Sequence, residues 1–156
     1  MVDRLLIYQN SIFSHQYNKK EKRKWKQSEK YREIQINIAQ SRGTEKYIKS
    51  SIWPHLVFTD GINQLRQDAD CFWLVDAIAS HQREEEFQVW RLEVDKEKKT
   101  AVLTMKEDTG QPELVRQEIP YTDFPLESIE FYVAVDGYGT AENWTECLVL
   151  MLKNEY

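Results

Sequence analysis

The sequence predicts an α+β fold in which N-terminal helices pack on an antiparallel sheet of about five strands. Two observations carry this prediction. Apolar residues recur at helical spacing up to residue 80, whereas from residue 87 onward they occupy every second position. Charged or glycine-containing turns separate the alternating runs, as they do between consecutive antiparallel strands. With 156 residues, the chain is long enough to bury a sizeable core in one domain.

Three short helices are expected first. One extends from its N-cap Ser28 to about residue 40, and a second covers residues 45–51 before a Trp-Pro pair. After an extended piece at residues 55–58, Thr59 or Asp60 caps a third helix that continues through residue 65. Each of these predictions depends on a capping residue followed by helical spacing.

The fourth expected helix, residues 71–80, is the most apolar segment of the chain. A helix that is apolar on most sides belongs in the centre of the fold. Its buried stripe is expected to consist of Phe72, Val75, Ile78 and Ala79, widened by Cys71 and Leu74.

Five strands are expected after a charged turn that follows this helix. They are residues 87–94, 101–105, 115–121, 129–135 and 148–152. The connections at residues 95–99 and 108–110 have the composition of tight turns. The expected topology is an antiparallel meander with the helices on one face.

The charge of the chain is divided unevenly. Residues 1–49 hold 12 Lys and Arg against 5 Asp and Glu, whereas residues 50–156 hold 9 against 21. We therefore divide the chain into a basic N-terminal extension, residues 1–30, and a single α+β domain, residues 31–156. An acidic body of this kind repels phosphate backbones, whereas the basic extension could attract them.

The basic extension has three interpretations. The extension could be a solvated tail, it could dock on another protein or on the acidic body, or it could contact nucleic acid. The acidic body adds no second basic patch, which weakens the last interpretation. In nucleic-acid binding, Trp25 would stack on a base, and the positive charge would come from six cations: Lys19, Lys20, Lys22, Arg23, Lys24 and Lys26.

Catalytic motifs are scarce, and Asp76 is the most interesting single carboxylate. On the helical wheel it falls near the expected buried stripe, where an unpaired carboxylate is costly. In a structural role it would accept hydrogen bonds that fix the helix on the sheet. In a catalytic role it would work with His81, one turn along. Together with Asp60 and Asp123 it could also form a carboxylate cluster for a hard cation.

The remaining composition favours a cytoplasmic protein without cofactor or resident metal. Cys71 and Cys147 fit neither a metal-binding spacing nor a disulfide framework, and both are expected to be reduced core thiols. No stretch approaches the ~20 apolar residues of a membrane helix. Nothing in the sequence fixes the oligomeric state, so a homodimer stays open.

Several strings resemble a small bacterial family catalogued as a domain of unknown function. They are FTDG (58–61), FWLVDAIASHQ (72–82), FQVWRLEV (87–94), QEIPYTDFPL (117–126) and LMLKNEY (150–156). The resemblance covers about residues 40–156 and brings no established activity. It implies a standalone protein from the variable, often mobile part of bacterial genomes, with a role in phage, plasmid or defence biology.

The leading functional hypothesis is a non-enzymatic protein-interaction or regulatory module whose acidic body binds a basic partner surface. The first alternative is a small metal-dependent hydrolase or nuclease that uses Asp60, Asp76, His81 and Asp123. The second alternative is nucleic-acid binding by the basic extension.

Overall fold

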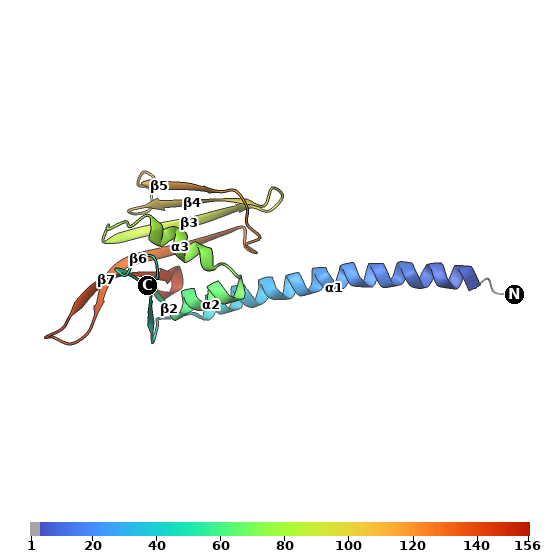
Figure 1. Cartoon of the computed structure of the whole chain (residues 1–156), viewed down its shortest axis with the longest axis horizontal. Coiled ribbons are helices and arrows are strands. Elements are labelled where there is room, and N and C mark those ends of the chain that lie inside the picture. The colour runs from blue at the N-terminus through green and yellow to red at the C-terminus, as the bar shows by residue number, and fades with distance from the viewer. Residues whose placement is uncertain (1–3) are drawn as a thin grey trace. The chain divides into compact units, whose positions relative to one another are not determined.

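The computed structural model describes the backbone of residues 4–156 and the side chains of residues 19–156 (Figure 1). The chain divides into two compact units, residues 1–33 and residues 34–156. The predicted α+β class is confirmed. Three helices accompany one mixed, mostly antiparallel sheet of seven strands in the described part of the chain.

The first helix, α1 (Arg4–Gln40), begins far earlier than predicted. Ser28 is not its N-cap, because it lies inside the helix and its hydroxyl donates to the Trp25 carbonyl oxygen at 3.0 Å. Neither glycine nor proline occurs before Gly43, and the Lys, Glu and Gln residues around Ser28 favour a continuing helix. The helix ends close to the predicted residue, and Gly43 follows with a φ of 72°.

The sheet has the strand order β1-β2-β7-β6-β3-β4-β5. Its strands are β1 (Tyr47–Lys49), β2 (Leu56–Thr59), β3 (Phe87–Asp95), β4 (Thr100–Lys106), β5 (Val115–Ile119), β6 (Ser128–Tyr138) and β7 (Thr145–Leu152). All five predicted strands are present, and β3, β4 and β5 form the expected meander. β6, however, returns to pair with β3, and β7 pairs with β2 in parallel.

The prediction of a second helix at residues 45–51 is wrong. Its residues form the edge strand β1, in which Ile48 lies opposite Phe58 of β2. Pairing with a buried strand outweighs the weak local preference of such a short segment for helix. The other two predicted helices are confirmed as α2 (Asp60–Asp68), with Thr59 as N-cap, and α3 (Phe72–Ser80).

The main core lies between one face of the sheet and the helices. Phe131 of β6 and Leu150 of β7 meet the apolar side chains of α2 and α3, including Leu65 and Val75. Trp90 is fully buried on the same face. Burying each such side chain contributes about 1.5–3 kcal/mol, so this face supplies most of the apolar stabilisation.

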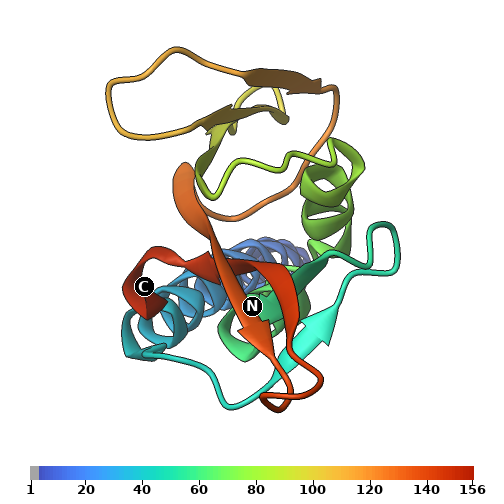
Figure 2. The same ribbon diagram turned by 90° about the vertical axis from the view of Figure 1, so that its left-hand side faces the viewer.

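The hairpin of β6 and β7 projects beyond the neighbouring strands in Figure 1 and points toward the viewer in Figure 2. β6 pairs with β3 only up to Ala134, and β7 pairs with β2 only from Leu148. The two hairpin strands continue to pair with each other as far as Tyr138 and Thr145. The tip therefore has solvent on both sides, and it carries Trp144, which is 61% exposed.

Candidate functional site

The face of the sheet opposite the helices is open to solvent along β3 and β6, and we call this region the open face. Where β2 pairs with β7, the side chains on both faces of the sheet are buried. Along β3 and β6, residues of the helix side are buried, whereas the residues between them are half-buried or exposed. This alternation is the signature of a sheet with one face in water. The open face is therefore available to a ligand or a partner.

Three aromatic residues form the centre of the open face, and we call them the aromatic cluster. The ring centroids of Phe87 and Tyr132 lie 5.2 Å apart, and Tyr156 lies 5.4 Å from Phe87 and 5.6 Å from Tyr132. The contacts are tilted or edge-to-face, the arrangements that aromatic pairs prefer. Phe87 and Tyr132 are half-buried, whereas Tyr156 is 75% exposed, so the cluster presents aromatic surface to solvent mainly through Tyr156.

Apolar surface continues from the aromatic cluster toward the β6–β7 hairpin. Met151 lies opposite Tyr132 in the strand register. Beyond it, Met151 and Tyr138 pack against a small buried group made of Val57, Cys147 and Val149. The three residues of this group are buried, so only the partly exposed side chains of Met151 and Tyr138 continue the apolar surface of the aromatic cluster.

Charged side chains border the aromatic cluster. The Glu130 carboxylate pairs with Lys153 Nζ at 3.0 Å and with Arg91 Nη1 at 3.1 Å. The hydrogen bond from Lys153, together with the charge of Arg91, lowers the pKa of Glu130. Lys153 Nζ also lies 5.9 Å from the Tyr132 ring centroid. Cations and anions thus alternate beside the aromatic rings, and this part of the rim carries no large excess of either sign.

At the hairpin end of the open face, Tyr47 donates its hydroxyl proton to Asp136 Oδ2 at 2.7 Å. This hydrogen bond and the negative charge of Asp136 disfavour the phenolate, raising the pKa of Tyr47 to about 12. Lys49 Nζ lies 5.6 Å from the Tyr138 ring centroid. These contacts tie the edge strand β1 to the projecting hairpin.

The prediction that Asp76 lies near the buried stripe is wrong. Asp76 is exposed, and so is Phe72, which is 44% exposed. The buried side of α3 is formed by Leu74, Val75, Ile78 and Ala79. On a helical wheel with 100° per residue, the centre of this buried side lies about 130° from Asp76. A side chain in water cannot have the buried structural role or the buried catalytic role considered for it.

His81 is the C-cap of α3, where the negative end of the helix dipole favours it. Its Nε2 atom hydrogen-bonds Gln117 Oε1 at 2.7 Å, and its ring lies 5.7 Å from that of Trp90. These contacts hold the end of α3 against β3 and β5. His81 therefore has a structural explanation that needs no substrate.

The other two aspartates occupy separate places. Asp60 is the first residue of α2, and the hydroxyl of Thr44 donates to it at 2.5 Å, which lowers its pKa. Asp123 is exposed in the connection between β5 and β6. Among residues 19–156, no group of three or more His, Cys, Asp or Glu side chains is placed to hold a metal ion. These positions give no support to the hydrolase alternative.

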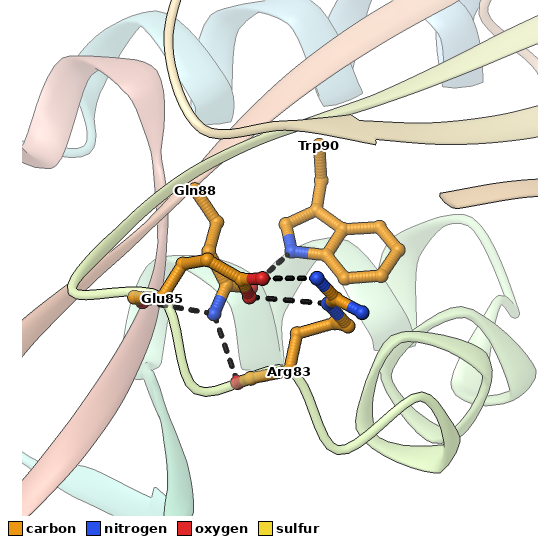
Figure 3. A network of polar contacts seen from close by, with 4 residues as sticks. All are labelled: Arg83, Glu85, Gln88 and Trp90. Atoms are coloured by element: carbon orange, nitrogen blue, oxygen red, sulfur yellow. Dashed lines mark hydrogen bonds and ion pairs between the residues drawn. The ribbon is translucent and has the colours of Figure 1, made fainter. Parts of the chain in front are cut away.

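A buried polar network orders the connection between α3 and β3 (Figure 3). Trp90 Nε1 donates to Gln88 Oε1 at 2.8 Å, and Gln88 Nε2 donates to the carbonyl oxygens of Arg83 and Glu85 at 2.9 and 3.1 Å. Burial alone would raise the pKa of Glu85, but the ion pair with Arg83 outweighs it and lowers that pKa. Gln88 is only 2% exposed, so the network serves the fold.

The FTDG segment, one of the strings behind the family resemblance, also has a structural explanation. The Thr59 hydroxyl donates to Glu155 Oε2 at 2.6 Å, and the Leu152 backbone N–H donates to the same oxygen at 2.9 Å. We call this arrangement the Glu155 clasp. The carboxylate lies so close to Gly61 that a Cβ there would be 2.3 Å from Glu155 Oε1. A larger residue at position 61 would therefore have to displace the Glu155 carboxylate from the clasp.

The two cysteines fit their predicted place in the core. Cys71 and Cys147 are both free and buried. Burial raises the pKa of the Cys71 thiol to about 12 and also raises that of Cys147. A thiol with a raised pKa is a poor nucleophile near neutral pH, so neither has the character of a reactive cysteine.

All of the predicted binding residues of the basic extension lie in α1. Residues 19–30 form part of that continuous helix, and each of them is exposed. Trp25, for example, is 68% exposed. None of the helices in the described part of the chain is long and apolar enough to cross a membrane.

A family model described as a family of unknown function (DUF6876) matches residues 32–156. The chain belongs to this family. The match covers every strand of the sheet and confirms the resemblance seen in the sequence. No curated protein and no solved structure gives a significant match. DUF6876 membership therefore brings no activity with it, and the chain's own surfaces are the remaining source of evidence on function.

Sequence reasoning missed the open face of this DUF6876 domain. Phe87, Tyr132 and Tyr156 are 45 and 24 residues apart along the chain, and only the pairing of β3 with β6 brings the first two together. The available signal was the alternation of β3 and β6, which places Phe87 and Tyr132 on the side opposite Trp90 and Phe131. Chemically, this face offers aromatic and apolar side chains that are bordered by charges of both signs.

Proposed function

We propose that residues 34–156 form a protein-interaction module that binds its partner through the open face. The observation that carries the proposal is the exposed aromatic cluster, which is continuous with the apolar side chains of Met151 and Tyr138. Aromatic residues, Met and Arg are enriched in the centres of protein interfaces, and all of them occur here. Large exposed aromatic side chains that are already held in place supply contact area at little entropic cost.

The partner is proposed to be a basic protein. Residues 34–156 hold 12 Lys and Arg against 22 Asp and Glu, a balance of −10. A field of this sign speeds the encounter with a positively charged surface and slows that with an acidic one. The charged rim of the open face contains both signs, so it can form complementary pairs once the partner has arrived.

Site-directed photo-crosslinking in the native host tests this proposal. p-Benzoylphenylalanine replaces Tyr156, which is 75% exposed on the open face, or Phe72, which is 44% exposed on α3. Both positions are exposed aromatics, so the two variants differ mainly in the face that they report. The adducts are purified through a tag on the chain and identified by mass spectrometry.

We expect Tyr156 to yield an adduct with a basic protein that Phe72 does not yield. A Tyr132→Ser change in the Tyr156 variant should reduce that adduct several-fold, because it removes a ring of the aromatic cluster. Equal adducts from both positions would reject the open face as the docking surface. An adduct with a second copy of this acidic chain would contradict the proposal that the partner is a basic protein.

A further inference from the structure

The exposed part of α1 carries an ordered row of cations, which we call the basic stripe: Lys19, Arg23, Lys26 and Lys30. At 100° per residue, these four positions fall within an arc of about 60° on one side of the helix. All four are exposed. At 1.5 Å per residue, the stripe is about 16 Å long.

The other residues of this helical segment lie outside the 60° arc, and the nearest other cation, Lys22, lies about 70° from the centre of the stripe. Lys20 and Lys24 lie about 90° and 130° from its centre, and Trp25 lies about 130° away on the other side. The acidic residues nearest in sequence, Glu21 and Glu29, also fall outside the arc. The stripe is therefore a continuous cationic edge, and Trp25 does not belong to it.

We propose that the basic stripe binds the phosphate backbone of a nucleic-acid duplex. This inference concerns residues 1–33 and is independent of the function proposed for the open face. A duplex carries one phosphate per ~3.4 Å of its axis on each strand, so a duplex length of about 16 Å holds enough phosphates for all four cations of the stripe. Four exposed, flexible cations on one edge of a helix can contact these phosphates without reading the sequence of the duplex.

An anionic membrane fits the same segment less well. A helix that lies in a membrane interface needs an apolar face opposite its cations. Opposite the stripe, residues 19–30 offer Glu21, Lys24, Trp25 and Ser28, of which only Trp25 is apolar. Backbone phosphates of a duplex require charge alone, and charge is what the stripe supplies.

Charge-matched variants of the full chain test the proposal. Binding of a fluorescent 20-base-pair duplex is measured by anisotropy at salt concentrations from 50 to 200 mM. The stripe variant is Lys19→Gln with Lys26→Gln, and the control variant is Lys20→Gln with Lys24→Gln. Both lose two positive charges from the same turns of the helix, so only the face differs.

Four phosphate contacts predict a slope of about −3.6 in log K against log salt, a loss of about 150-fold over this range. The stripe variant should halve that slope to about −1.8, a loss of about 12-fold, whereas the control variant should keep it. Equal slopes for the two variants would overturn the proposal that the basic stripe contacts the duplex. So would the absence of duplex binding, or binding to phosphatidylserine vesicles without binding to the duplex.

Discussion

Removing the carboxylate of the Glu155 clasp should destabilise the whole domain. In Glu155→Ala, the Thr59 hydroxyl and the Leu152 N–H both lose the oxygen that accepts from them, at 2.6 and 2.9 Å. Each hydrogen bond to a charged acceptor contributes about 1.5–3 kcal/mol, and the half-buried position of Glu155 favours the lower end. We expect the free energy of unfolding to fall by ~3 kcal/mol, measured by urea denaturation followed by circular dichroism.

Two further variants make this measurement decisive. Glu142→Ala removes an exposed carboxylate from the β6–β7 connection and should change the free energy of unfolding by less than ~0.5 kcal/mol. A double-mutant cycle with Thr59→Val should give a coupling energy of at least ~1 kcal/mol, because the two side chains share a hydrogen bond. If Glu155→Ala were as mild as the control, the turn that carries Glu155 would contribute nothing to stability and the reasoning would fail.

Two other predictions concern side-chain hydrogen bonds. Tyr47 has a pKa of about 12 in the folded chain, above its ordinary value of about 10, so the stability it confers is present below pH ~10 and lost as pH rises toward 12. In absorbance titrations near 295 nm, Asp136→Asn should move this late ionisation back toward pH 10, and an unchanged titration would contradict the assignment. Trp90→Phe leaves the buried Gln88 Oε1 without its donor and removes ring volume, which should cost about 2–4 kcal/mol in urea denaturation. A loss below about 1 kcal/mol would show that the network is not needed to order the α3–β3 connection.

Local sequence patterns predicted those elements whose signal is local. Thr59 caps the start of α2 because its hydroxyl oxygen accepts from the backbone N–H of Ile62, only three residues further along the chain. The β3–β4 turn likewise follows from Asp95, whose carboxylate accepts from the backbone N–H groups of Glu97 and Lys98. Capping and turn chemistry of this kind can be read from neighbouring residues alone.

Elements whose stability comes from distant partners could not be predicted this way. β1 exists because Ile48 pairs opposite Phe58, and the parallel partner of β2 lies about ninety residues further along the chain. Asp76 was misplaced because the helical wheel was centred on Phe72, whose ring packs against the Arg66 guanidinium at the surface instead of entering the core. The aromatic cluster was not predicted because its three rings are far apart in the sequence and meet only in the folded sheet.

The parallel pairing of β2 with β7 sets an order of events for a chain emerging from a ribosome. β7 lies in the interior of the sheet, between β2 and β6, although it is the last strand to be made. Until residues 145–152 have left the exit tunnel, β1 and β2 on one side and β3 to β6 on the other have no strand to join them. Until then, the nascent domain exposes the unpaired edges of β2 and β6, and such edges are sites of aggregation. Handling by a chaperone during synthesis thus matters more for this domain than for one whose last strand lies at an edge.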